Sequence, residues 1–196
     1  MNLIIFTGAP ASGKSSFAKR LSESLSIVSV SKDEMKIQLF QQFGFSSHAE
    51  KKKLSMQGER LMYDTIREHC DSCLDLIVDN NFKNFNAIRK IVGEHDVVLC
   101  VSCYANSAVL ARRYNERIAN RQRSLSLYTL NKYPTVDGLS EFHKPIDSEG
   151  VERIQREVLE GFYGKAVLAI DTTRIDNEYE TLYAQIESFV LEYMER

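Results

Sequence analysis

The stretch N-L-I-I-F-T-G-A-P-A-S-G-K-S-S-F-A-K-R-L, residues 2–21, decides the fold. It begins with an apolar run that ends in glycine, which predicts a buried strand. It continues with apolar residues at helical spacing, namely Phe17, Ala18 and Leu21. Between the two, G-A-P-A-S-G-K-S at residues 8–15 matches the pattern G-x-x-x-x-G-K-[ST] in the strand–loop–helix context that this pattern requires. Such a loop predicts a cradle for phosphate groups.

Each part of this glycine loop has a physical reason. Glycines let the backbone turn so that successive N–H groups point into one cavity, and the following helix adds its positive end. Lys14 would place a cation against the β- and γ-phosphates of a nucleoside triphosphate, and the Ser15 hydroxyl would bind Mg²⁺. We therefore expect ATP and Mg²⁺ as cofactors. The residues expected to hold the nucleotide are Gly8, Ala9, Pro10, Ala11, Ser12, Gly13, Lys14, Ser15 and Ser16.

Strands and helices alternate along the rest of the chain. Short runs rich in β-branched residues predict the strands, and apolar residues at helical spacing predict the helices. After the first strand, the predicted strands cover residues 27–30, 76–81, 96–104 and 166–171. The predicted helices cover residues 14–25, 33–43, 55–73, 87–92, 107–121, 148–159 and 177–195. This alternation predicts an α/β fold in three layers, with a five-stranded parallel sheet and helices on both faces.

The length and composition favour a single domain over residues 1–196. Hydrophobic residues at 43% and charged residues at 27% are ordinary for a soluble globular protein. The apolar runs fall far short of the roughly 20 residues that cross a bilayer, and the amino terminus lacks the pattern of a signal peptide. We therefore expect a cytoplasmic protein without a membrane partner. The net charge of −2 argues against a large, uniformly basic surface but allows a local basic patch.

Four cysteines fall in two C-x-x-C pairs, Cys70/Cys73 and Cys100/Cys103. This spacing suits a tetrahedral zinc site, which takes four ligands. The second pair, however, lies inside V-V-L-C-V-S-C-Y, a run typical of a buried strand. Buried thiols without a metal are therefore the preferred interpretation, and zinc is the alternative.

The residues after the third predicted strand bear on the class of nucleotide-binding protein. A motor ATPase typically ends this strand in Asp-Glu, whereas here Asp79 is followed by Asn80 and Asn81. The guanine-reading pattern N-K-x-D of GTPases does not occur in the sequence. We interpret Asp79 as part of the Mg²⁺ site at the strand end, with an ordinary turn residue as the alternative.

Asp33 is a candidate general base. It follows the second strand in S-V-S-K-D-E-M-K, at the carboxyl edge of the sheet where open α/β folds bind ligands. A kinase needs such a carboxylate to accept the proton of the acceptor hydroxyl. A helix-start carboxylate beside the helix dipole is an equally good interpretation of the same residue.

An arginine-rich segment at residues 111–132 supplies the cations that a kinase needs. Six basic residues stand against one acid, Glu116, whereas a solvated helix face would mix the signs. The basic residues are Arg112, Arg113, Arg117, Arg121, Arg123 and Lys132. We interpret residues 112–132 as a lid that closes over phosphates during transfer. Arg113 and Arg117 share one helix face because they are four residues apart, and both are candidate catalytic and ATP-binding residues.

Together these segments resemble the P-loop kinases related to polynucleotide 5′-hydroxyl kinases, including the phage enzyme and the kinase domain of the mammalian polynucleotide kinase/phosphatase. The resemblance extends over most of the chain. Its segments are residues 8–21, 31–36 (S-K-D-E-M-K), 77–84 (I-V-D-N-N-F-K-N), 112–117 (R-R-Y-N-E-R), 142–154 (F-H-K-P-I-D-S-E-G-V-E-R-I) and 167–173 (V-L-A-I-D-T-T).

The resemblance implies roles for individual residues. Asp33 would accept the proton of the attacking hydroxyl, and Lys36 and Asn81 would contact the substrate. Arg113 or Arg117 would contact the ATP phosphates. Polynucleotide kinases usually carry arginine at the position of Lys36, and lysine cannot make the bidentate phosphate contact of a guanidinium.

These observations favour an enzyme that transfers the γ-phosphoryl group of ATP, with Mg²⁺, to a hydroxyl group. The first choice of acceptor is the 5′-OH end of RNA or DNA. Residues that could form a cationic track with stacking aromatics are the lid arginines, Lys51, Lys52, Lys53, Tyr114, Tyr128 and Tyr133. A kinase of a small metabolite or nucleoside would use the same catalytic residues, and the unremarkable net charge favours it. A nucleotide-dependent binding module that hydrolyses ATP slowly is a third alternative.

Overall fold

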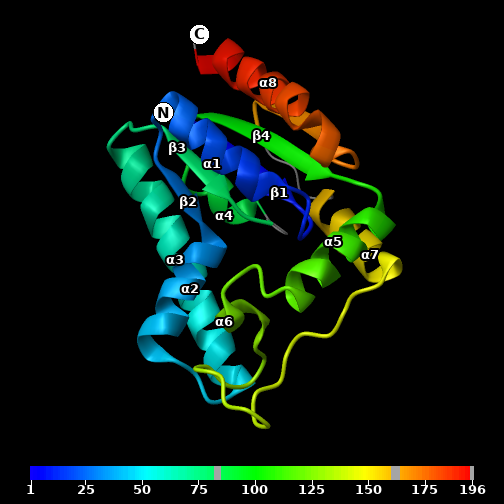
Figure 1. Cartoon of the computed structure of the whole chain (residues 1–196). Helices are drawn as coiled ribbons and strands as arrows, with labels where there is room; N and C mark the ends of the chain where they lie inside the picture. The colour runs from blue at the N-terminus through cyan, green and yellow to red at the C-terminus, as the bar shows by residue number, and fades with distance from the viewer. Residues whose placement is uncertain (82–84, 160–163, 195–196) are drawn as a thin grey trace.

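A computed structural model describes residues 1–81, 85–159 and 164–194. Within them, five strands form one sheet in which all neighbours are parallel (Figure 1). The spatial order is β2, β3, β1, β4, β5. The strands are β1 (Asn2–Gly8), β2 (Ser29–Ser31), β3 (Leu76–Asp79), β4 (Val97–Tyr104) and β5 (Ala166–Asp171). The predicted five-stranded parallel sheet is confirmed.

Helices cover both faces of this sheet, which confirms the predicted α/β fold (Figure 1). One face carries α1 (Lys14–Leu25) and α8 (Ile175–Met194), and the other carries α3 (His48–Asp71) and α4 (Asn86–Arg89). The other helices are α2 (Lys32–Phe43), α5 (Ser107–Ala119), α6 (Leu125–Tyr128) and α7 (Ser148–Leu159). None of the helices in the described part of the chain has the length and hydropathy needed to cross a membrane.

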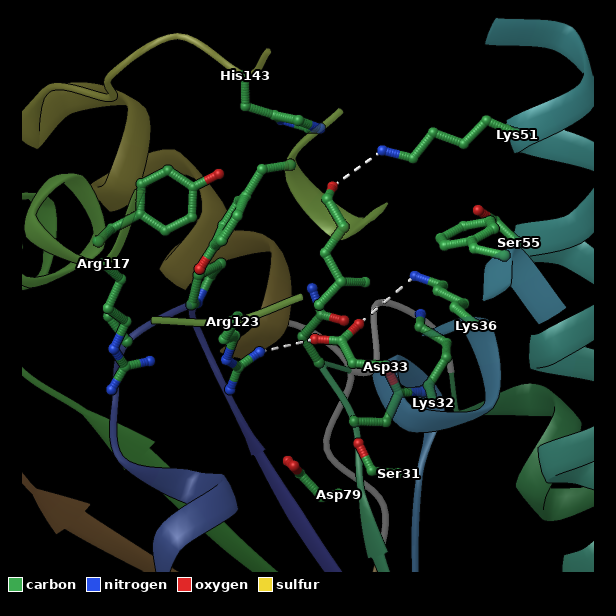
Figure 2. Close-up of a pocket in the computed structure, with 18 of the residues that line it drawn as sticks. Ser31, Lys32, Asp33, Lys36, Lys51, Ser55, Asp79, Arg117, Arg123 and His143 are labelled. Atoms are coloured by element: carbon green, nitrogen blue, oxygen red, sulfur yellow. Dashed lines mark hydrogen bonds and ion pairs between the residues drawn. The ribbon is translucent and has the colours of Figure 1, made fainter. Parts of the chain in front are cut away.

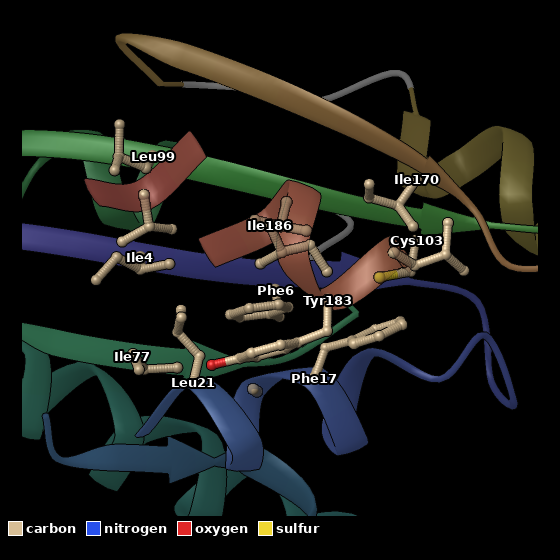
Figure 3. Close-up of a cluster of buried hydrophobic side chains, with 14 of the residues drawn as sticks. Ile4, Phe6, Phe17, Leu21, Ile77, Leu99, Cys103, Ile170, Tyr183 and Ile186 are labelled. Atoms are coloured by element: carbon tan, nitrogen blue, oxygen red, sulfur yellow. The ribbon is translucent and has the colours of Figure 1, made fainter. Parts of the chain in front are cut away.

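β1 is the central strand because its apolar side chains pack on both sides of the sheet. Ile4 and Phe6 belong to a buried cluster with α1 and α8, and Leu3 and Ile5 belong to a second one with α3 and α4. Figure 3 shows the first cluster, to which α1 contributes Phe17. All five side chains are fully buried. Burial of a side chain of this size stabilises the fold by roughly 1.5–3 kcal/mol, so β1 is held firmly in the middle of the sheet.

The register of the strands fixes the geometry at their carboxyl ends. Phe6 of β1 pairs with Asp79 of β3, so Asp79 lies beside the start of the glycine loop. On the other side, Gly8 pairs with Cys103 of β4. A Cβ atom on Gly8 would lie 2.2 Å from the Cys103 carbonyl oxygen. This close approach explains why the loop begins with glycine.

Helix α3 begins at His48, seven residues before its predicted start at residue 55. A cap explains the difference. The Ser47 hydroxyl accepts a hydrogen bond from the Glu50 backbone N–H, and the Glu50 carboxylate accepts one from the Ser46 N–H. The additional turns bring the lysines at residues 51–53 onto this helix.

Other boundaries differ by a few residues from those predicted. β2 begins at Ser29 instead of residue 27, where its pairing with β3 starts. Helix α4 is a single turn, and α8 begins at Ile175 instead of residue 177. Residues 82–84, which belong to the segment that resembles the kinases, and the predicted helix end at residue 195 lie outside the described residues.

The four cysteines are free thiols in different environments. Cys100 and Cys103 are buried in the two clusters on opposite faces of the sheet, because three residues along a strand reverse the side-chain direction. Cys70 is half-buried, and Cys73 is exposed, so only the second pair fits the prediction of buried thiols. In residues 1–81, 85–159 and 164–194, no three His, Cys, Asp or Glu side chains are grouped as a metal site requires.

Candidate active site

The glycine loop leaves backbone N–H groups open at the start of α1. Gly8, Ala11 and Gly13 have positive φ angles of 149°, 68° and 84°. A positive φ is unfavourable for a residue with a Cβ atom, such as Ala11. Strained backbone of this kind is concentrated at functional sites. Helix α1 starts at Lys14 without a side-chain cap from any described residue. Its first N–H groups can therefore bind an anion, assisted by the helix dipole.

Some of the remaining loop residues are buried and support the loop, and others line cavities beside it. Ala9 is buried in a cluster with α5 and α7, and Ser12 is fully buried. Pro10 lines a cleft, whereas Ser15 and Ser16 line a separate pocket.

This pocket, the phosphate pocket, has a volume of about 240 Å³. Its cations are Lys14 of α1 and the lid residues Arg117 and Arg123, and no described carboxylate lines it. The cavity thus combines open N–H groups with three positive charges. It suits a polyphosphate chain, whose oxygens make charge-assisted hydrogen bonds with such donors.

Arg117 lies in a crowded group of cations. Its side chain extends from α5 toward the glycine loop (Figure 2). Burial lowers the pKa of Arg117, and the neighbouring charges of Arg123 and Arg113 lower it further. An anion placed among these groups would relieve their mutual repulsion. The arrangement is therefore favourable for a phosphate group.

Arg113 is held differently, although it shares a helix face with Arg117. Its guanidinium donates hydrogen bonds to the carbonyl oxygens of Thr172 and Thr173 at 2.9 and 3.0 Å. It also lies 3.7 Å from the Asp176 carboxylate. These contacts fix α5 to the segment between β5 and α8. Arg117, and not Arg113, lines the phosphate pocket.

Asp33 lies in the first turn of α2, between a lid cation and a cation of its own helix. Its Oδ2 accepts a hydrogen bond from Arg123 at 3.0 Å, and its Oδ1 lies 3.7 Å from Lys36 Nζ (Figure 2). Partial burial would raise the pKa of this carboxyl, but the charges of Lys36, Lys14 and Arg123 outweigh that effect and hold the pKa below its usual value. The side chain is 41% exposed, so an ionised carboxylate remains open to a substrate.

Ser15 and Asp79 supply oxygen atoms beside the glycine loop, and both line a third pocket together with Asp33. The Asp79 carboxylate is buried and lies 3.9 Å from Lys14 Nζ. Its Oδ1 has no hydrogen-bond partner among the described residues. An orphaned carboxylate oxygen and a hydroxyl are the ligand types that a hard cation such as Mg²⁺ prefers. The residues present therefore fit a magnesium ion.

The cleft that Pro10 lines, called the acceptor cleft below, has a volume of about 410 Å³ and lies between α2, α3 and the lid (Figure 2). Lys14, Arg117 and Arg123 line it as well as the phosphate pocket, so the two cavities meet at these cations. The lining also includes the three residues predicted to contact substrate, which are Asp33, Lys36 and Asn81.

The far end of the acceptor cleft is bridged from α3 to the lid. Lys51 Nζ donates hydrogen bonds to the carbonyl oxygens of Leu127 and Thr129. The backbone of Phe45 pairs with that of Tyr133, which joins the connection between α2 and α3 to the segment after the lid helix α6. These contacts join α3 and the α2–α3 connection to the segment around α6.

Two contributions to this site were not identified from the sequence. The sequence shows Arg123 only as one of the lid cations, because its ion pair with Asp33 spans 90 residues and follows no local spacing. The excess of basic residues at 111–132 is the one sequence signal that points to Arg123. In the sequence, Asn80 stands out only because it replaces the glutamate of the Asp-Glu pair of motor ATPases, yet Asn80 is buried and lines the acceptor cleft. Its position as a polar residue at the end of a buried strand is the feature that indicates a role in the site.

Solved structures share this fold. A proposed kinase from Chloroflexus aurantiacus J-10-fl superposes with a TM-score of 0.70 at 22% identity, covering 97% of this chain and 96% of that one. A gluconokinase from Sinorhizobium meliloti 1021 gives 0.52 at 16% identity, with 98% and 97% covered. A shikimate kinase from Bacteroides thetaiotaomicron gives 0.53 at 16% identity, with 96% and 97% covered. The chain thus has the fold of P-loop kinases.

Comparison with curated proteins found no match. A family match covers the glycine loop, the acceptor cleft helices and the lid. Residues 3–132, about two thirds of the chain, match AAA_33, a family described as an AAA domain. The chain belongs to this AAA domain family.

Proposed function

We propose that this protein is an ATP-dependent kinase that phosphorylates a hydroxyl group of a small molecule. One observation carries the proposal. The phosphate pocket and the acceptor cleft meet at Lys14, Arg117 and Arg123, and the carboxylate of Asp33 faces this junction. A donor phosphate and an acceptor hydroxyl placed in the two cavities would meet beside a base and three cations.

On the donor side, the triphosphate of ATP would lie on the N–H groups of the glycine loop. Lys14 and Arg117 would neutralise charge that develops on the transferred phosphoryl group. The nucleoside would occupy an adjoining pocket of about 420 Å³, which is lined by Arg113, Ile175 and Tyr179 among others. In this arrangement, Arg113 holds α5 against the nucleoside pocket.

On the acceptor side, Asp33 would accept the proton of the attacking hydroxyl. Its lowered pKa keeps it ionised, so it is ready to accept a hydrogen bond from the hydroxyl, and the proton would transfer late, as the bond to phosphorus forms. Arg123 orients the carboxylate. Ser15 and Asp79 would hold Mg²⁺, which when bound neutralises phosphate charge.

A small acceptor is favoured over the polynucleotide that the sequence suggested. Lys51 and the backbone pair of Phe45 and Tyr133 join α3 and the α2–α3 connection to the segment around α6, which disfavours a long strand in the cleft. Of the aromatics proposed for stacking, Tyr114 and Tyr128 line the cleft, but Tyr133 stacks on Phe45 with ring centroids 6.0 Å apart. The gluconokinase and shikimate kinase that share the fold add support, since both names specify small acceptors.

Phosphoryl transfer can be tested with γ-labelled ATP. The acceptors would be gluconate, shikimate, neutral sugars, nucleosides and 5′-OH oligonucleotides. We expect label in a small molecule. Label in oligonucleotides alone would restore the polynucleotide acceptor. Release of phosphate at the same rate with every acceptor, without labelled product, would instead indicate a slow ATPase.

Chelation of divalent cations is expected to abolish transfer, and added Mg²⁺ to restore it. Substitution Asp79→Asn should raise the Mg²⁺ concentration for half-maximal activity by roughly 10–100-fold, because it removes the charge of a buried carboxylate near the ion. The measurement is a Mg²⁺ titration of initial rate at saturating ATP. An unchanged midpoint in Asp79→Asn would show that Asp79 does not support the metal.

Arg117→Gln is expected to reduce kcat by roughly 10²-fold, because it removes one cation from the developing phosphoryl charge. The control is Arg156→Gln on α7. Arg156 is 68% exposed, pairs with Glu152 and lines none of the four pockets. Initial rates at saturating ATP should separate the two variants. Equal rates for both would remove Arg117 from the proposed machinery.

A further inference from the structure

The acceptor cleft carries more positive charge than ATP phosphates can use. Seven lysine and arginine side chains line it against two carboxylates, a surplus of five. The cations are Lys14, Lys32, Lys36, Lys51, Lys52, Arg117 and Arg123, and the acids are Asp33 and Asp79. Three of the cations also line the phosphate pocket. The other four come from α2 and α3 and do not line the phosphate pocket.

Two of these four lysines lack a counter-ion among the described residues. Lys32 is paired with Glu59 at 3.7 Å and is balanced. Lys36 shares Asp33 with Arg123, which makes the shorter contact. In the described part of the chain, no carboxylate lies within 4 Å of Lys51 or Lys52. The hydrogen bonds of Lys51 go to neutral carbonyl groups. Charge gathered at a partly desolvated site is costly unless an anion is bound there.

The pKa of Lys51 reports the same imbalance. Desolvation, and after it the charge of Lys36, lower the pKa of Lys51 to about 8. The neighbouring His143 has a lowered pKa as well, because of burial first and then the positive charges of Lys51 and His48. His48 and His143 both line the cleft (His143 is labelled in Figure 2). An anion at this place would favour the charged forms of Lys51 and His143.

Building on the proposed kinase function, we propose that the acceptor is a small hydroxylated acid. Its carboxylate or phosphate group lies against Lys36, Lys51 and Lys52, and its reacting hydroxyl reaches Asp33.

The remaining lining fits the polar part of such a molecule. The Asn80 side chain is only 3% exposed, and neither of its amide atoms has a hydrogen-bond partner among the described residues. Unsatisfied buried amides are rare and are commonly explained by a ligand or water. Ser31 and Ser55 add hydroxyl groups to the lining. A volume of about 410 Å³ suits a molecule the size of a sugar acid.

The test measures binding separately from catalysis. Isothermal titration, with Mg²⁺ and a non-hydrolysable ATP analogue present, would compare D-gluconate, sorbitol 6-phosphate and sorbitol. These probes share a six-carbon polyol chain and differ in the anionic group, so the two acids separate carboxylate from phosphate recognition. At least one acid should bind about 10-fold or more tightly than sorbitol, the ratio expected from one charge-assisted contact.

Variants locate the anion. Lys36→Gln and Lys52→Gln should each weaken acid binding by about 10-fold and leave sorbitol binding unchanged. The matched control is Lys53→Gln, because Lys53 neighbours Lys52, is exposed and does not line the cleft. It should bind acids like the unmodified protein.

Three results would overturn the inference. These are equal binding of sorbitol and the acids, absence of acid binding up to about 10 mM, and acid binding that neither lysine variant weakens. Tighter, Lys36-dependent binding of a 5′-OH oligonucleotide would also replace it. Other results test the proposed kinase function independently of the anion site. Acids that bind but are never phosphorylated would refute the kinase and keep the anion site, whereas phosphorylation of sorbitol and acids with equal efficiency would refute the anion site alone.

Discussion

Asp33→Asn should retain ATP binding and lose phosphoryl transfer by roughly 10²–10⁴-fold, the usual contribution of a general base. The amide keeps the shape of the side chain but cannot accept a proton at neutral pH. The measurement is the initial rate of labelled product formation at saturating ATP, together with ATP affinity by titration. The rate and the affinity should respond very differently, because Asp33 faces the acceptor cleft and does not line the phosphate pocket.

The control for this variant is Glu68→Gln, which removes an exposed carboxylate from α3. Glu68 lines none of the four pockets. Its rate should equal that of the unmodified protein. A measurement of thermal stability guards against a trivial cause, since Asp33→Asn also breaks the ion pair with Arg123. If Asp33→Asn transferred phosphate at the normal rate, the base would have to be sought elsewhere.

The central part of the fold was predictable because its signals are local. The apolar run at residues 2–7, the glycine loop and the first helix follow one another directly in the sequence. Asp79 ends a buried strand, and parallel pairing with β1 brings it to the loop without any long-range information. Asp33 likewise follows β2 by two residues. Residues placed by the ends of parallel strands are thus predictable from the strand pattern alone.

The walls of the acceptor cleft were not predictable in the same way. Lys51 contacts carbonyl groups more than 70 residues away, and Arg123 contacts Asp33 across 90 residues. Both lie where periodicity is weak. The start of α3 is polar and depends on the Ser47 cap, and Arg123 follows a backbone turn at Arg121, which has a positive φ of 50°. Such contacts depend on tertiary packing, which no spacing rule encodes.

The lid shows that a correct local prediction can leave the role of a residue undetermined. Arg113 and Arg117 do lie on one helix, as their spacing predicts. That spacing cannot say which of them meets a ligand. The segment after β5 offers two carbonyl groups to Arg113, which leaves Arg117 and the later Arg123 at the phosphate pocket. The division of roles is set by the segment after β5, 59 and 60 residues further along the chain.

Lys14→Met should remove most of the affinity for ATP and reduce transfer by roughly 10²–10³-fold. Lys14 is 8% exposed and lines both cavities, so its charge acts in a partly desolvated site where no other described side chain could replace it at the same position. Methionine preserves the length and packing of the side chain. In the unmodified protein, the Asp79 carboxylate lies 3.9 Å from Lys14 Nζ. Without the lysine charge, this carboxylate would repel the incoming phosphates.

Thermal unfolding provides the measurement for Lys14→Met. At an ATP concentration about 100 times Kd, binding should stabilise the unmodified protein by about 2.7 kcal/mol, which corresponds to a rise in Tm of roughly 5–10 °C for a chain of this size. A loss of about 10²-fold or more in affinity would reduce the rise to less than about 2 °C. Lys53→Met on α3 is the control, because Lys53 is exposed and lines none of the four pockets. It should keep the full rise, since its charge lies outside the proposed site. An ATP-dependent rise of equal size in both variants would mean that the triphosphate does not lie on the glycine loop.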